Sequence, residues 1–184
     1  MSYSNSFSVS FYHSNFIKYD LLTKFNYRNI YQVPIFRKIV LSFVFKETNL
    51  KNFLQAAAVL ELITGQKMFI SKSRTPSISL KLRKGSPVGC KVVLRKKALI
   101  GFISKLILII FPNINVFNGI KLKKKKNELN SFSFSLSDLS LFPELESQYE
   151  FFQNLPKLNI SIVLSSKTSE EVSTVLTSYR FPLN

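Results

Sequence analysis

Few side chains in this sequence could take part in catalysis. The one histidine, His13, lies in a Ser-rich stretch with no acidic residue beside it that could orient a general base. The one cysteine, Cys90, alternates with apolar residues, as a buried strand residue does. Glu144, Glu146 and Glu150 cluster without a histidine or aspartate constellation, and the five glycines form no phosphate-binding loop. We therefore expect no enzyme activity, no metal site and no cofactor.

The segment 67–95 combines many cations with hydroxyl side chains. It holds eight Lys or Arg and no acidic residue, whereas soluble hairpins usually mix both signs of charge. Cations of this kind neutralise phosphates, and the interspersed serines can hydrogen-bond phosphate oxygens, which gives affinity without sequence recognition. The segment therefore predicts contact with RNA. Its cations are Lys67, Lys72, Arg74, Lys81, Arg83, Lys84, Lys91 and Arg95.

The net charge of +16 is unevenly distributed along the chain. Residues 1–127 carry 23 Lys or Arg and three acidic residues, whereas residues 128–184 carry three and seven. A basic body with a mildly acidic end fits a protein held between RNA and other proteins. The alternative partner is an anionic membrane surface, which requires a basic amphipathic helix. The most apolar run, 98–111, contains only Lys105 and is too short to span a membrane.

The hydrophobic periodicity predicts strands intermixed with helices. We expect strands at 37–45, 67–70, 77–82, 88–95, 132–136 and 158–165, and helices at 20–27, 50–64, 99–110 and 168–179. Several strands are joined by connections too short for parallel crossovers. The expected fold is α+β, a two-layer single domain with a mostly antiparallel sheet and helices packed on one face. This RNA-binding domain would occupy residues 19–184, after a flexible segment at 1–18.

Five blocks of residues match one known family in order and spacing. The blocks are Asn26-Tyr27 with Gln32–Pro34 and Lys38-Ile39; Thr64–Lys67 with the basic segment 71–84; Pro87–Arg95; Phe142–Leu145; and Leu158–Ile162 through Ser169–Glu171 to Phe181-Pro182. In these blocks the chain resembles the family of large-subunit ribosomal protein number five, the universal proteins bound to 5S ribosomal RNA in the central protuberance. The likeness runs from about Tyr19 to Leu183.

The resemblance implies a structural protein of the large ribosomal subunit that binds 5S rRNA and large-subunit rRNA. The residues it implies for RNA binding are Lys38, Ser42, Gln66, Lys67, Lys91, Val93 and Arg95. It also implies a loop that reaches tRNA in the peptidyl site, with Lys72, Ser73, Arg74, Lys81, Arg83 and Lys84. Neighbouring ribosomal proteins would be partners, including a small-subunit protein across the subunit interface.

The chain departs from the family pattern at several polar positions. Ser42 replaces an asparagine of the first strand, and Val93 replaces a threonine and cannot donate a side-chain hydrogen bond. Lys outnumbers Arg 20 to 6, Phe reaches 18 and Trp is absent, a composition typical of an AT-rich coding genome such as that of an organelle. We expect a mitochondrial ribosome, with another organelle or a bacterial cytoplasm as the alternative.

Overall fold

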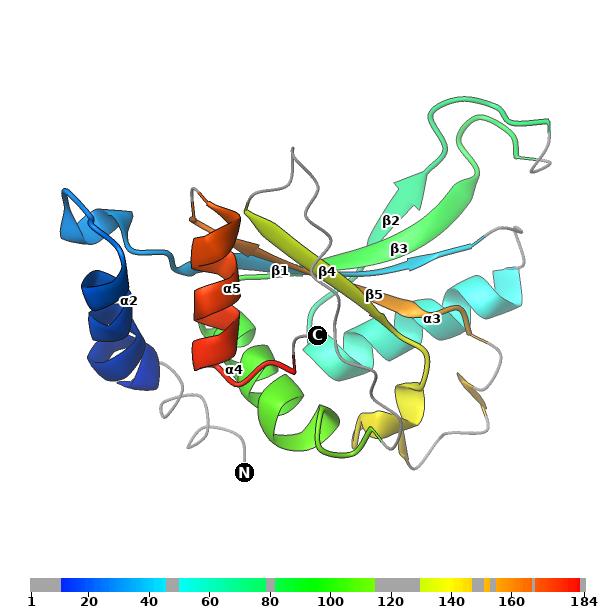
Figure 1. Ribbon diagram of the computed structural model, residues 1–184. Coiled ribbons are helices and arrows are strands. Elements are labelled where there is room, and N and C mark those ends of the chain that lie inside the picture. Colours follow the sequence, from blue (N-terminus) through cyan, green and yellow to red (C-terminus); the bar gives the residue numbers. More distant parts are fainter. Residues whose placement is uncertain are drawn as a thin grey trace. The chain divides into compact units, whose positions relative to one another are not determined.

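The computed structural model describes residues 11–45, 50–78, 82–114, 130–146, 151–152, 155–166 and 168–182. Five strands form one sheet in the order β2-β3-β1-β5-β4 (Figure 1). The strands are β1 (Phe36–Val44), β2 (Phe69–Lys72), β3 (Pro87–Leu94), β4 (Ser131–Leu136) and β5 (Leu158–Leu164). The α-helices are α2 (Lys18–Lys24), α3 (Leu50–Thr64), α4 (Lys96–Lys105) and α5 (Ser169–Ser178). Shorter helical turns are η1 (His13–Ile17), η2 (Ile30–Gln32), η3 (Leu106–Ile110) and η4 (Leu139–Leu141).

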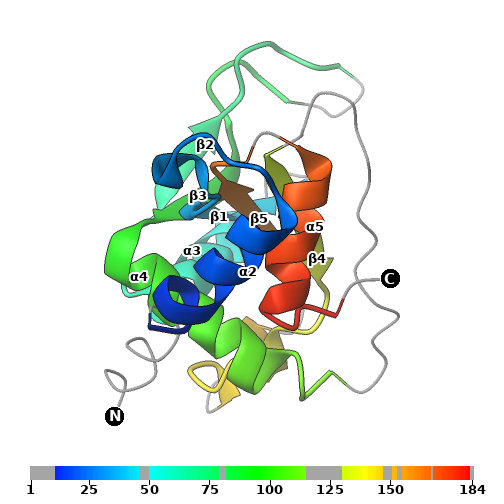
Figure 2. The same ribbon diagram turned by 60° about the vertical axis from the view of Figure 1, so that its left-hand side comes forward.

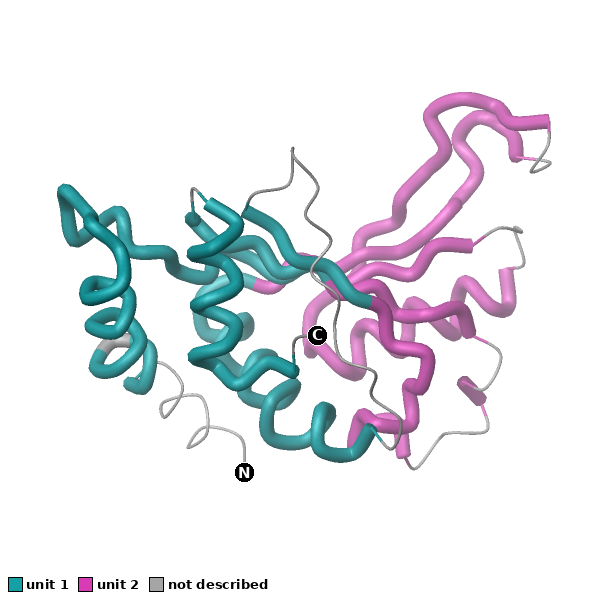
Figure 3. The backbone as a smooth tube through the Cα atoms, viewed as in Figure 1, with its two compact units in different colours: residues 1–39, 95–134, 161–184 teal, residues 40–94, 135–160 magenta. Residues whose placement is uncertain are grey.

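The chain divides into two compact units (Figure 3). Unit 1 comprises residues 1–39, 95–134 and 161–184, and unit 2 comprises residues 40–94 and 135–160. Because the boundaries cut β1, β4 and β5, both units contribute strand segments to the sheet.

Unit 2 has its core between β3 and α3. Alternate residues of β3, including Cys90, Val92 and Leu94, are buried on the face toward α3, whereas Lys91 and Val93 on the other face are exposed. Apolar residues at helical spacing line the buried face of α3. The helix ends at Gly65, whose φ of 63° favours glycine and whose N–H donates to the Glu61 carbonyl at 2.8 Å. The predicted helix 50–64 is therefore confirmed, while its predicted N-cap at Asn49 lies outside the described residues.

Strands β1 and β3 approach unusually closely at Gly89. A Cβ atom built on Gly89 would collide with the carbonyl oxygen of Phe43. The pairing continues beside it, where the N–H of Phe45 donates to the carbonyl of Val88 at 2.9 Å. Only glycine permits this separation of the two backbones.

Unit 1 packs α4, α2 and α5 around its own apolar core. The predicted helical stripe is buried throughout and ends before Pro112, which confirms it; its members are Leu99, Phe102, Ile103, Leu106 and Ile110. In α5, the Thr168 hydroxyl accepts from the Glu171 N–H at 3.3 Å, and the predicted capping box is present. Helix α2 lies beside α5 (Figure 2), where the Ser178 hydroxyl donates to the Asp20 carboxylate at 3.2 Å.

The expected fold class is confirmed: the protein is α+β, with a mostly antiparallel sheet and helices packed on one face. One expected strand is wrong, because residues 77–82 contribute to the described structure a single bridge between Ser77 and Leu82 rather than a ladder. The division into a flexible segment 1–18 and a domain 19–184 stays a prediction. Residues 1–10 lie outside the described residues, and 11–17 are helical.

Candidate nucleic-acid interface

Strands β2 and β3 form a long antiparallel hairpin whose loop, residues 73–86, projects from the rest of unit 2 (Figure 3). The register places Phe69 opposite Lys91, and a β-bulge between Ser71 and Lys72 shifts it toward the loop. At the base of the loop, the Ser73 N–H donates to the Ser86 carbonyl at 2.9 Å. Gly85, with a φ of 87°, donates its N–H to the Ser73 carbonyl at 3.0 Å. The loop is therefore held at its base by backbone hydrogen bonds.

The predicted cations of unit 2 are exposed on and around this hairpin. They are Lys67, Lys72, Arg74, Arg83, Lys84 and Lys91, whereas the predicted Lys81 lies outside the described residues. Within the described part of the chain, none of these six forms an ion pair with a carboxylate. Their charges are thus available to an anionic partner.

The turn after α3 brings a second predicted pair, Gln66 and Lys67, to the surface. The Gln66 N–H donates to the Thr64 hydroxyl at 3.3 Å, and the Met68 N–H donates to the Glu61 carboxylate at 3.2 Å. Both Gln66 and Lys67 are exposed. These bonds fix the backbone on each side of the pair while its side chains remain in solvent.

Several predicted residues lie on the sheet face opposite α3. In β3, Lys91 and Val93 are exposed, and in β1 the half-buried Ser42 alternates with buried Leu41 and Phe43. Ser73, at the base of the loop, is half-buried and its hydroxyl donates to the Thr75 carbonyl at 2.6 Å. The backbone thus already occupies the donor that had been predicted for tRNA.

Two of the predicted RNA-binding residues, Lys38 and Arg95, belong to unit 1 rather than unit 2. Lys38 is half-buried on β1, and Arg95 is exposed at the N-cap of α4. Their participation in one surface with the hairpin stays a prediction.

Sequence reasoning assigned no role to Phe69, which the fold places beside a predicted RNA contact. Its side chain is 66 % exposed, and the Lys91 ammonium nitrogen lies 5.4 Å from its ring centroid. The alternation of exposed and buried residues in β3 was visible in the sequence. The register between the two strands was not, so nothing could pair Phe69 with Lys91.

The predicted structural role of Cys90 agrees with its burial. Its side chain is 1 % exposed, and burial raises the pKa of its thiol to about 11. A thiol so placed is almost fully protonated at neutral pH and is a poor nucleophile. The described residues contain no group of His, Cys, Asp and Glu able to hold a metal ion. No helix among them is long and apolar enough to cross a membrane.

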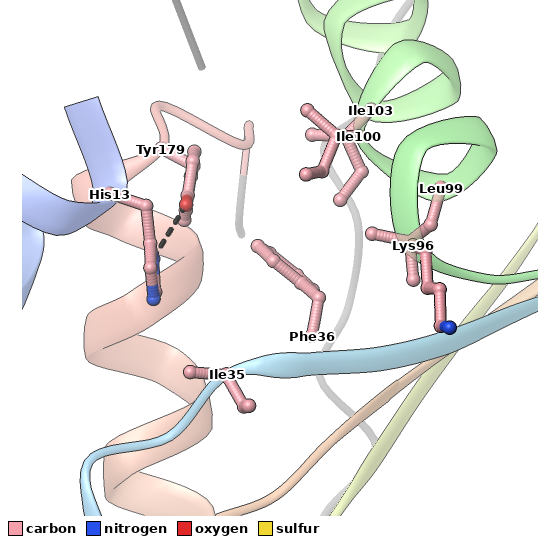
Figure 4. Close-up of a pocket in the computed structure, with 8 residues that line it drawn as sticks. All are labelled: His13, Ile35, Phe36, Lys96, Leu99, Ile100, Ile103 and Tyr179. Carbon is pink, nitrogen blue, oxygen red and sulfur yellow. Dashed lines mark hydrogen bonds between the residues drawn. The ribbon is translucent and has the colours of Figure 1, made fainter. Parts of the chain in front are cut away.

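His13 has a partner that its surroundings in the sequence did not indicate. Its Nδ1 lies 2.7 Å from the Tyr179 hydroxyl, and the two rings stack with centroids 5.9 Å apart. Figure 4 shows this pair on one side of a small pocket of unit 1, opposite apolar side chains of α4. Burial, and then the charge of Lys18, lower the pKa of His13. The pair ties the N-terminal turn to the end of α5.

The lowered pKa of His13 predicts a pH dependence of stability. The unfolded chain takes up a proton near the ordinary pKa of 6.5, whereas the folded chain resists protonation until lower pH. The free energy of unfolding should therefore fall as pH decreases from 6.5 to the lowered folded pKa. Because His13 is the only histidine, urea unfolding of His13→Gln across this range provides the control. An identical pH slope in the variant would contradict the assignment.

The sequence was compared with known proteins. A model of the C-terminus of the uL5 ribosomal protein family matches residues 87–183. The large ribosomal subunit protein uL5m of Reclinomonas americana is 36 % identical over 175 residues, covering 94 % of this chain and 96 % of that protein. The chain belongs to the uL5 family. Another relative, uL5 of Blochmanniella floridana, is 35 % identical over 174 residues, covering 94 % of this chain and 90 % of that protein.

Membership of the uL5 family identifies the chain as a structural, non-enzymatic protein of the large ribosomal subunit. Ribosomal RNA and other ribosomal proteins are accordingly its partners. The exposed cations of the hairpin lie in or just before the segment that matches the uL5 C-terminal family model.

Proposed function

We propose that this uL5-family chain binds 5S rRNA and large-subunit rRNA in the central protuberance and reaches peptidyl-site tRNA with the loop 73–86. The RNA contacts would come from Lys38, Ser42, Gln66, Lys67, Lys91, Val93 and Arg95. The loop contacts would come from Lys72, Ser73, Arg74, Lys81, Arg83 and Lys84. A small-subunit protein would be contacted across the subunit interface.

The observation that carries the proposal is the hairpin with exposed cations and no carboxylate partner among the described residues. Closely spaced like charges repel each other, and phosphates relieve this repulsion. The loop is anchored at its base by Ser73, Gly85 and Ser86, so docking it on RNA costs less conformational entropy than ordering a free loop.

We propose a mitochondrial ribosome as the location. The likeness to a protein named uL5m supports this, as does the Lys- and Phe-rich composition. The relatives named uL5 from bacteria are similarly close, so the test is the cellular fraction in which the chain cosediments with large subunits.

Direct RNA binding tests the molecular part of the proposal. The full chain should bind 5S rRNA with an affinity that falls linearly with salt on logarithmic axes, at a slope that grows with the phosphates neutralised. Filter binding at several salt concentrations measures this slope. Salt-independent binding, or stronger sedimentation with anionic liposomes than with ribosomes, would contradict it.

A further inference from the structure

We propose that Phe69 and Lys91 form a stacking site for one unpaired RNA base on the open face of the β2–β3 hairpin. This inference rests on the proposed function and adds a recognition mode to it. Phosphate contacts alone cannot distinguish an unpaired nucleotide from a paired one, whereas a stacking site can, because only an unpaired base is free to stack.

The position of Phe69 is unusual for its residue type. Phenylalanine is usually buried, yet 66 % of this side chain is exposed. Isolated exposed apolar residues are common on protein surfaces, so exposure alone carries nothing. What distinguishes Phe69 is its partner across the ladder, Lys91, directly opposite in the register.

The register also fixes which side of the sheet the ring occupies. Directly opposed residues of two strands point to the same face, so Phe69 shares the face of Lys91. Cys90 and Val92 point to the other face, which is buried. The ring therefore lies on the open face, where no described helix of unit 2 covers it.

The charges around the ring suit a nucleotide. The Lys91 nitrogen lies 5.4 Å from the ring centroid and has no carboxylate partner among the described residues. Lys67, two residues before the ring, is also exposed. A lysine on a flexible four-carbon stem can turn from the ring to a phosphate while the base takes its place on the ring face. Aromatic rings flanked by cations bind single-stranded nucleic acid in this way.

The absence of tryptophan from the sequence permits a direct test in the full chain. Phe69→Trp preserves an aromatic platform and adds a single fluorophore. Its probes are a 12-nucleotide oligoadenylate and an inorganic polyphosphate of similar charge, because the second has no bases. The matched control is Phe151→Trp, at a ring 68 % exposed in the acidic segment of the chain.

Oligoadenylate should quench the fluorescence of Phe69→Trp as it saturates the site, while polyphosphate should bind without this quenching. The Phe151→Trp control should show no quenching with either. In addition, Phe69→Leu should lower oligoadenylate affinity about 5-fold or more, the effect of losing one stacked base, and leave polyphosphate affinity unchanged.

The possible failures are distinguishable. Salt-dependent binding of oligoadenylate without quenching at position 69, or equal quenching by both polyanions, would overturn the stacking site and leave the proposed RNA binding intact. No binding of oligoadenylate or 5S rRNA at any salt concentration would overturn both. Full affinity in Phe69→Leu would overturn the stacking site alone.

Discussion

Reversing the charge of Lys72 and Arg74 to Glu should lower peptidyl-site tRNA occupancy about tenfold or more, since a hydrogen bond to a charged group contributes about 1.5–3 kcal/mol. The loop would then present two anions to the tRNA backbone. Incorporation into the large subunit should persist, because the cations and the sheet face outside the loop are unchanged. Sucrose-gradient sedimentation measures incorporation, and filter binding of labelled tRNA to the purified ribosomes measures occupancy.

The matched control reverses two lysines of the Lys123–Lys126 run, which lies outside the described residues. This double variant changes the net charge of the chain by the same amount. It should affect tRNA occupancy much less, because a charge without a fixed position is screened within about 8–10 Å by salt. Equal defects in the two double variants, or failure of the loop variant to enter the subunit, would show that the loop has another partner.

Replacing Gly89 by Ala should be the most destabilising of the simple glycine substitutions. The added methyl group would collide with the Phe43 carbonyl, so β1 and β3 would have to separate. Overpacking of this kind costs about 1–3 kcal/mol. The free energy of unfolding, measured by urea titration of the full chain, should fall by this amount.

Gly101→Ala provides the control, because Gly101 lies inside α4 with nothing within 4 Å of an added Cβ. Alanine favours the helical conformation over glycine, so this variant should gain about 0.5–1 kcal/mol. If both alanine variants changed stability in the same direction, the close approach of β1 and β3 would not be the reason for the glycine at position 89.

Elements with strong local signals were predictable from the sequence. Helix α3 has the predicted bounds, and the faces of β3 follow the alternation around Cys90. Thr168 and Glu171 form the predicted capping box, because both partners lie within one helical turn. The positive charge of the hairpin was also visible, since composition needs no knowledge of the fold.

Features that depend on pairing between distant residues were not predictable. The Phe69–Lys91 contact needs the register of two strands, and the need for glycine at position 89 needs the spacing of β3 from β1. The bond of His13 to Tyr179 joins residues 166 positions apart. The expected strand at 77–82 fails for a different reason: alternation shows that a ladder is possible there, but in the described structure Ser77 and Leu82 form only one bridge.

The bulge in β2 has a consequence for copies of the protein that have not yet met RNA. In the strand order, β2 stands at one end of the sheet, and an open strand edge is a template on which another chain can add a strand. This edge is only four residues long, its register shifts between Ser71 and Lys72, and it ends in a cation. All three properties oppose strand addition. The irregularity beside the loop therefore also protects the unassembled protein from aggregation.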